Sequence, residues 1–87
     1  MLLNQLRSQM DAITADLVAL LAKRTEIARE IALIKKREGF PIFDPDRENE
    51  IKSQVRERAL MGGISPVMME EIIQIILDYT RVEQGAV

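Results

Sequence analysis

The stretch "LLNQLRSQMDAITADLVALLAKRTEIAREIALIKKRE", residues 2–38, carries one uninterrupted helical pattern. Its seam positions step by three and four residues throughout, and neither Pro nor Gly interrupts them. These positions are Leu3, Leu6, Met10, Ile13, Leu17, Leu20, Arg24, Ile27, Ile31 and Ile34. Gly39 then supplies a C-terminal stop, preceded by basic residues that suit the negative end of the helix dipole. The pattern predicts a single long helix from residue 2 to about residue 38.

The rest of the chain predicts two shorter helices. The second runs from Pro45 to about Met61, with Asp44 as its N-cap and a glycine pair at its end. The third begins at Pro66 and is apolar over most of its circumference, so we expect it to be heavily buried. We find no internal repeat or second domain. The sequence therefore predicts an all-α fold and a single domain over residues 1–87.

The length of the first helix predicts the oligomeric state. A helix of about 36 residues is about 54 Å long. A compact monomer of 87 residues would have a diameter of only roughly 30 Å. The two shorter helices each span about half of the long one and cannot cover its whole seam. A second copy running antiparallel would cover the remainder, so we expect an intertwined homodimer of three-helix chains.

Composition excludes several classes of function. The net charge of -2 gives no broad attraction to nucleic acid or anionic membranes, and the basic run at 35–37 has no aromatic neighbours. The chain contains no Cys and no His, which removes disulfides, thiol nucleophiles, the usual zinc sites and the commonest general base. No run of 18 apolar residues is present, so we expect no membrane span. A cysteine-free chain fits the cytoplasm, where we expect the protein to act.

Arg24 is the first residue that does not fit a plain core. It occupies a seam position that is otherwise apolar, and an unpaired buried guanidinium is costly. It should therefore meet a fixed anion. That anion is either a bound ligand or an acidic side chain such as Glu26 or Glu30 from another helix, unless the stem simply snorkels toward water. The sequence alone leaves these readings open.

Lys35 and Arg7 are two further cations of the same helix that could bind an anionic ligand. Lys35 returns to within about 20° of the Arg24 face, about 16 Å further along the helix, with Ala28 and Ile31 between them. Two cations flanking a small apolar floor describe a pocket for a dianion with an apolar skeleton, although Lys35 taken alone is better explained as a helix-end cation. Arg7 lies more than about 25 Å from Arg24 and cannot serve the same pocket within one chain. It is either a solvated arginine or a contribution to the pocket of an antiparallel partner.

The start of the second helix, "FDPDREN" at residues 43–49, breaks local rules. A capping box would place Glu or Gln where Arg47 stands, and Arg47 faces the positive end of the helix dipole. Asp44, Asp46 and Glu48 could hold Mg²⁺, but cap carboxylates are far commoner and the adjacent arginine opposes a metal. We therefore expect no metal site at this turn.

A stripe on the third helix begins apolar and ends polar. Ile73, Leu77, Thr80 and Gln84 follow one another at spacings of 4, 3 and 4 residues. Gln84 either donates a neutral hydrogen bond into a cavity or reaches solvent at the helix end.

The polar candidates suit one kind of chemistry. They are Arg7, Arg24, Lys35, Arg47, Glu48, Thr80 and Gln84. They include no convincing nucleophile, poised base or metal-ligand set, so they fit a reaction that needs only positioning and electrostatic stabilisation. A pericyclic rearrangement of a dicarboxylate is of this kind, because cations hold both carboxylates while donors stabilise charge on a breaking C–O bond.

These residues resemble the pattern of the all-helical (AroQ-type) chorismate mutases. The resemblance is carried by "LR…D", "LLAKRTEIAREIALIKK", "PIFDPDRE" and the late "Q", and it covers residues 2–84. It implies an intertwined dimer of three-helix chains. It also implies rearrangement of chorismate to prephenate in the shikimate pathway of aromatic amino acid biosynthesis, with no cofactor and no metal.

The resemblance implies four catalytic residues and one contribution from a partner. Arg24 resembles the cation for one substrate carboxylate, and Arg7 of the partner subunit resembles the cation for the other. Lys35 and Gln84 resemble the pair that donates to the ether oxygen. Glu48 resembles the acceptor for the ring hydroxyl.

The resemblance also implies five residues that bind substrate or line its pocket. Asp44 resembles the residue whose main chain helps to hold the ring hydroxyl, and Arg47 resembles a cation of the pocket wall. Thr80 stands where the family often has Ser, which keeps a hydroxyl near a carboxylate. Ile31 and Leu77 would form apolar walls.

Two alternatives remain open at the level of sequence. An isochorismate-pyruvate lyase of the same fold would use a similar cationic pocket, although "DPDRE" and the short inter-helix loop favour the mutase. A non-enzymatic helical dimerisation module would explain the seam but not the arginine within it.

Overall fold

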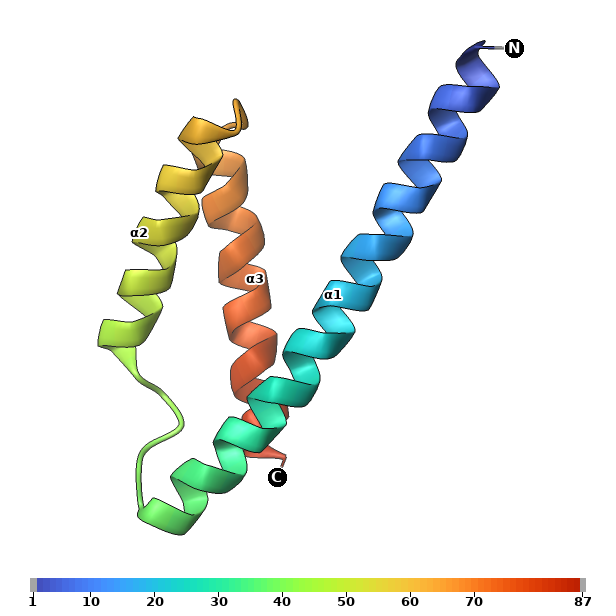
Figure 1. Cartoon of the computed structure of the whole chain (residues 1–87). Helices are drawn as coiled ribbons and strands as arrows, with labels where there is room; N and C mark the ends of the chain where they lie inside the picture. The colour runs from blue at the N-terminus through green and yellow to red at the C-terminus, as the bar shows by residue number, and fades with distance from the viewer. Residues whose placement is uncertain (1, 87) are drawn as a thin grey trace.

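The computed structural model describes residues 2–86 of the chain, so that Met1 and Val87, the ends of the predicted 1–87 domain, lie outside the described residues. The described part consists of α1 (Leu2–Glu38), α2 (Pro45–Met61) and α3 (Pro66–Gly85), without a strand among residues 2–86 (Figure 1). The predicted all-α class is confirmed. The predicted limits of the first two helices and the start of the third are confirmed as well.

The helix ends have local causes. The Asp44 side chain accepts a hydrogen bond from the backbone N–H of Arg47 at 3.1 Å, as an N-cap does. At the end of α1, Gly39 adopts a φ of 77°, and the N–H of Phe40 donates to the carbonyl of Lys35 at 2.8 Å. This left-handed turn satisfies a late carbonyl of α1 and sends the chain back toward α2.

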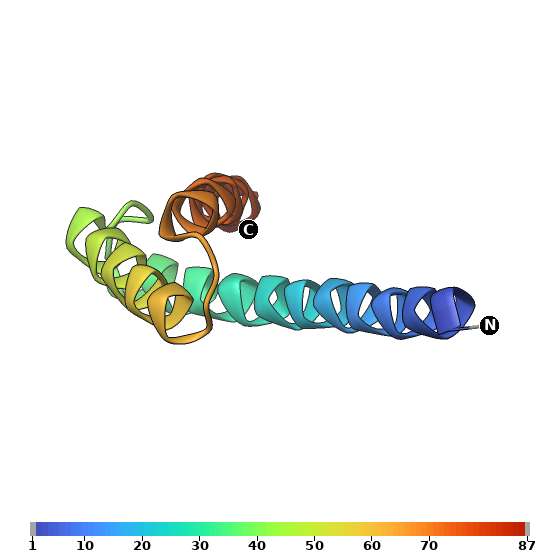
Figure 2. The same ribbon diagram turned by 90° about the horizontal axis from the view of Figure 1, so that it is seen from above.

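Helix α3 is the central element of the chain. It runs antiparallel to α2, with which it forms a helical hairpin, and it also packs on the C-terminal half of α1 (Figures 1 and 2). Helices α1 and α2 make no direct helix–helix contact within residues 2–86. The buried apolar residues are Ala28, Ala32, Ala59, Ile73 and Leu77. The alanines have little side-chain bulk, so they let α3 approach its two neighbours closely.

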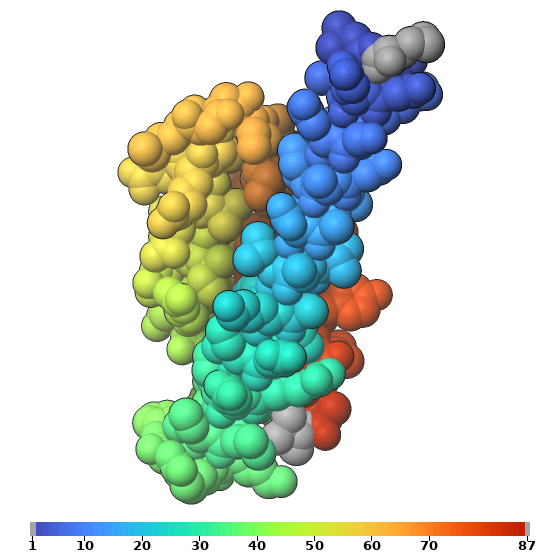
Figure 3. Space-filling view, turned by 45° about the vertical axis from the view of Figure 1, so that its right-hand side comes forward, coloured from blue at the N-terminus to red at the C-terminus, as the bar shows by residue number. Residues whose placement is uncertain are grey.

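The N-terminal half of α1 extends beyond the other two helices. The molecule measures 56 Å along its longest axis, and its radius of gyration is 16.0 Å, compared with about 12 Å for a compact chain of this length. The first turns of α1 stand clear of α2 and α3 in every view (Figures 1 to 3). The seam residues of this half are each more than half exposed, namely Leu3, Leu6, Met10, Ile13, Leu17 and Leu20. A row of exposed large apolar side chains of this length marks a surface for association.

The prediction that α3 is heavily buried is wrong for the single chain. Only Ile73, Leu77 and Gln84 of this helix are buried, whereas Ile72 is 40% exposed and Ile75 is 58% exposed. The reason is geometric, because α1 and α2 cover only part of the circumference of α3. The remaining apolar face of α3 is exposed beside the exposed seam of α1.

None of the three helices, as described over residues 2–86, combines the length and the apolar character needed to cross a membrane.

We expect the chain to form a homodimer, and a charge in the seam should weaken it. Ile13→Asp would place a carboxylate in the predicted interface, which should raise the dimer dissociation constant by about a hundredfold or more. Size-exclusion chromatography with light scattering should give twice the chain mass of 9.9 kDa for the unmodified protein and a monomer at low micromolar concentration for this variant.

Ser8→Asp is the matched control, because Ser8 lies on the opposite side of α1 from the seam. It should leave the dimer intact. A monomeric unmodified protein at micromolar concentration would contradict the predicted dimer.

Candidate active site

A pocket of about 320 Å³ opens where the C-terminal half of α1, the loop after it, the start of α2 and the end of α3 meet. Nine of the ten residues predicted from the sequence line it, namely Arg24, Ile31, Lys35, Asp44, Arg47, Glu48, Leu77, Thr80 and Gln84. Ala28, expected on the floor between Arg24 and Lys35, lines it as well, and its apolar lining is completed by Ile27, Ile42 and Ile51, which the sequence analysis did not assign. Three cationic and two carboxylate side chains line the pocket, so its formal charge is positive.

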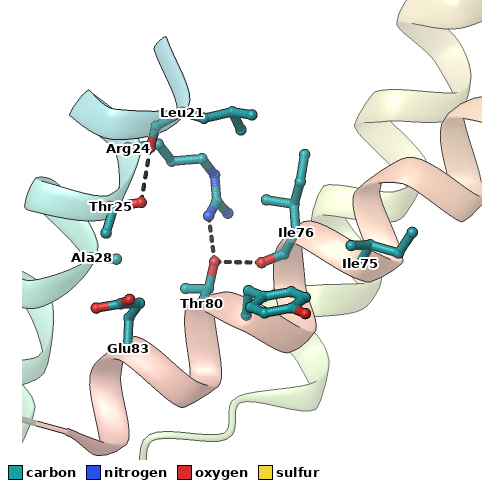
Figure 4. A pocket seen from close by; sticks show the side chains of 9 residues that line it. Leu21, Arg24, Thr25, Ala28, Ile75, Ile76, Thr80 and Glu83 are labelled. Carbon is teal, nitrogen blue, oxygen red and sulfur yellow. Dashed lines mark hydrogen bonds between the residues drawn. The ribbon is translucent and has the colours of Figure 1, made fainter. Parts of the chain in front are cut away.

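Arg24 projects from α1 toward α3 and is half-buried. Its Nη1 donates to the hydroxyl of Thr80, which in turn donates to the carbonyl of Ile76 at 2.7 Å (Figure 4). No carboxylate lies within ion-pair distance of Arg24 among residues 2–86, so the predicted alternative of a salt bridge to Glu26 or Glu30 is absent within this chain. Most of the N–H donors of this guanidinium therefore remain available for an anion.

A second cavity of about 310 Å³ lies on the other side of Arg24, between α1 and α3. Figure 4 shows Arg24 and Thr80 joined across this cavity, with Leu21 and Ile75 on its apolar walls. Tyr79 also lines it and is 68% exposed. Because Arg24 and Thr80 line both cavities, the guanidinium can be approached from two sides.

The side chains of Lys35 and Gln84 each make one hydrogen bond among residues 2–86. The Nζ of Lys35 donates to the carbonyl of Ile42 at 3.0 Å, and the Nε2 of Gln84 donates to the carbonyl of Ala28 at 3.1 Å. Gln84 is only 6% exposed, so the alternative that it reaches solvent is wrong. An ammonium carries three N–H donors and an amide carries two, so both side chains keep donors that are free for a ligand.

Arg47 lies at the exposed edge of the pocket. Its Nη1 pairs with Glu50 Oε1 at 2.8 Å, and both side chains are more than half exposed. Asp44 caps the same turn through the N–H of Arg47. The unfavourable position of this arginine at a helix start is thus offset by an acidic neighbour one turn later.

Glu48 has a partner that the sequence analysis missed. The Nη2 of Arg81, on α3, donates to Glu48 Oε1 at 3.0 Å, and the Nε of Arg81 lies 2.9 Å from Glu48 Oε2. The Glu48 side chain is only 12% exposed. A signal for Arg81 was present, because it lies four residues after Leu77 and three before Gln84, on the same stripe of α3.

Arg7 is the one predicted site residue outside the pocket. It lies in the projecting half of α1, about 26 Å from Arg24 along the helix, and it is exposed. The structure of one chain therefore brings together every predicted site residue except the one that the resemblance assigns to a partner.

The chain matches the family described as "Chorismate mutase type II" over residues 6–85. A protein named T-protein from Enterobacter agglomerans is 35% identical over 75 residues, which is 86% of this chain but 20% of the relative. A protein named chorismate mutase from Methanocaldococcus jannaschii is 29% identical over 82 residues, 94% of this chain and 83% of the relative. A protein named 4-amino-4-deoxychorismate mutase from Streptomyces venezuelae is 27% identical over 82 residues, 93% of this chain and 80% of the relative.

The chain thus spans about a fifth of the length of the T-protein, whereas it covers most of the two shorter relatives. The family match extends over nearly all of α1 and over the whole of α2 and α3. It includes every residue of the pocket described above. On this match, the chain belongs to the chorismate mutase type II family.

Proposed function

We propose that this protein is a chorismate mutase, which converts chorismate to prephenate by a concerted rearrangement. The observation that carries the proposal is the half-buried Arg24, which faces the pocket without a carboxylate partner among residues 2–86. Family membership and the positive pocket support the same assignment. We also propose that residues 1–87 act as one mutase domain and that the site of action is the cytoplasm.

The reaction needs no group on the enzyme to form a covalent bond. In the rearrangement an ether C–O bond breaks while a C–C bond forms within the same molecule, and negative charge grows on the ether oxygen. An enzyme accelerates such a step by holding the reactive conformer and by binding the developing charge more tightly than the ground state. The pocket has the groups for both tasks and a largely apolar lining.

Each polar group has one role in this proposal. Arg24 binds one carboxylate of the substrate. Lys35 and Gln84 donate to the ether oxygen through the N–H groups that their contacts with Ile42 and Ala28 leave unused. Glu48 accepts a hydrogen bond from the ring hydroxyl.

The remaining pocket residues position the substrate. The main chain at Asp44 helps to hold the ring hydroxyl, and Arg47 adds positive charge at the entrance. Thr80 supplies a hydroxyl beside Arg24, and Ile31 and Leu77 form the apolar walls.

The second substrate carboxylate needs a cation that one chain lacks. We assign it to Arg7 of the partner subunit. The exposed seam of α1 and the second cavity beside Arg24 support this assignment, because an antiparallel α1 lying along the seam would pass close to Arg24. The proposed site is therefore shared between two chains, and the homodimer is part of the proposal.

Chorismate is favoured over the amine that names the Streptomyces relative. An aliphatic amine is largely protonated at pH 7, and beside Glu48 its charge would also approach Arg81. A neutral hydroxyl meets no such repulsion. Separate assays would distinguish the candidate activities. Chorismate and 4-amino-4-deoxychorismate test for a mutase, and isochorismate tests for a lyase that releases pyruvate.

We expect the purified protein to consume chorismate and release prephenate, and Arg24→Ala to lose this activity. Removal of a charge-assisted contact to the substrate should lower kcat/KM by about a hundredfold or more. Loss of chorismate absorbance measures the rate, and light scattering and circular dichroism check that the variant remains a folded dimer. A rate like that of the unmodified protein would contradict the assignment of the pocket.

Arg29→Ala is the matched control for this experiment. Arg29 lies on the same helix and binds Glu83 at 2.9 Å, but its side chain is 54% exposed and does not line the pocket. It should leave kcat/KM within about twofold, because an exposed ion pair contributes little.

We expect the activity to be nearly independent of pH between about pH 5 and 9, because ordinary carboxyl groups and lysines titrate outside this range. The Gln84 amide donates without needing a proton. Gln84→Glu should replace this behaviour with a loss of kcat as pH rises from 5 to 8, since only a protonated carboxyl group can donate to the ether oxygen. Profiles of kcat against pH for both proteins measure the difference. A steep decline from pH 5 to 7 in the unmodified protein would count against Gln84 as a donor.

A further inference from the structure

The ion pair between Arg81 and Glu48 joins α2 to α3, two neighbouring elements that both contribute residues to the pocket. Glu48 lies in the first turns of α2 and lines the pocket, whereas Arg81 lies in the last turns of α3 and does not. The guanidinium faces both carboxylate oxygens, with Nη2 at 3.0 Å from Oε1 and Nε at 2.9 Å from Oε2. The Nη2 contact is a hydrogen bond, whereas the buried Nε lies close to Oε2 but forms no well-aligned hydrogen bond with it, so the pair fixes the carboxylate through one hydrogen bond and one close charge contact.

Two further contacts hold the guanidinium itself. Its central carbon lies 4.6 Å from the centre of the Phe43 ring, over the face of the ring. Its Nη2 also donates to Asp78 Oδ1 at 3.2 Å, one turn earlier on α3. Arg81 is thus held by the loop before α2, by its own helix and by Glu48, so its orientation is set independently of any ligand.

Burial makes this pair different from the other ion pairs among residues 2–86. The Glu48 side chain is 12% exposed, whereas the acidic partner in each other pair is at least 38% exposed. Water and salt screen a buried charge-assisted hydrogen bond less than an exposed one, so the buried bond is stronger. The contact also balances the negative charge of Glu48, which would otherwise oppose a dianionic substrate in the same pocket.

We propose that Arg81 is a positioning residue that fixes the Glu48 carboxylate for the substrate hydroxyl. A carboxylate offers about four acceptor positions. Arg81 occupies positions on the side of α3 and leaves others for a ligand in the pocket. This inference rests on the proposed function, because it concerns the hydroxyl-binding role of Glu48 in the mutase reaction.

A double-mutant cycle tests the proposal in the whole dimeric protein. Arg81→Met should lower kcat/KM for chorismate by about tenfold to a hundredfold, and Arg81→Lys, which keeps the charge but not the planar guanidinium, should recover part of it. In a Glu48→Gln background, the same Arg81→Met change should cost less than about twofold, because its target is already gone.

The control for a purely structural role is Arg56→Met. Arg56 also joins α2 to α3, through Glu70 at 3.1 Å, but neither residue lines the pocket. It should leave kcat/KM within about twofold even where it lowers the melting temperature as much as Arg81→Met does. An equal loss of kcat/KM from Arg81→Met in both backgrounds, or no loss in either, would overturn the positioning role.

A second readout does not depend on turnover. NMR of the Arg81 guanidinium should show separated Nη proton signals in the unmodified protein and collapsed signals in Glu48→Gln, because the carboxylate slows rotation of the group. Identical spectra in the two proteins would show that Arg81 does not hold Glu48 and would overturn the proposal. An unmodified protein without mutase activity would instead overturn the proposed function and the catalytic role of Arg81 with it, while the spectra would still decide whether the pair exists.

Discussion

The apolar seam of α1 continues far beyond the point where α3 stops covering it, and this mismatch governs the rest of the molecule. Helix α2 does not pack on α1 within residues 2–86, and the 20 residues of α3 span only about half of a helix of 37 residues. Helix α3 packs on the C-terminal half of α1, where Ala28 and Ala32 are buried, and leaves the other half as a row of exposed apolar side chains. The covered half holds Arg24 and Lys35, and the uncovered half holds Arg7. The half of α1 that packs within the chain therefore carries one proposed carboxylate-binding cation, Arg24, and the exposed half carries the other, Arg7.

The pocket exists because α3 changes character along its length. Its middle is anchored by buried Ile73 and Leu77, and its last turns carry Thr80 and Gln84, which bond to α1, and Arg81, which bonds to α2. Small residues on α1 allow this, since the Gln84 amide reaches the carbonyl of Ala28 across a close helix contact. The result is a polar end to an apolar interface, where cations can be partly desolvated without losing their partners. Such a place favours binding of an anion more than a fully solvated surface would.

The features of this structure that depend on residues close together in the sequence could be predicted from the sequence. Helix limits followed from the spacing of apolar residues, from Asp44 and Pro45 at one end and from glycines at the other, because these signals act within one turn. The prediction that most site residues lie close together came from their positions on shared helix faces and from the resemblance to the family. The burial of α3 could not be predicted in this way, since it depends on how many neighbours one chain provides. Arg81 was missed because its partner lies 33 residues earlier, and periodicity within a helix does not indicate which charges meet across helices.

The contacts of Lys35 also limit which insertions the loop between α1 and α2 can accept. Its carbonyl accepts from the N–H of Phe40 and its ammonium donates to the carbonyl of Ile42, so both ends of this residue hold the same loop. Surface loops between helices usually accept insertions. Here one added residue would separate the Lys35 ammonium from the carbonyl of Ile42, and it would also shift Asp44 and Glu48. The two hydrogen bonds of Lys35 therefore constrain the length of this loop, together with Ile42 in the pocket lining and Phe43 against Arg81, and variation among related chains should be sparse in this loop compared with the α2–α3 turn.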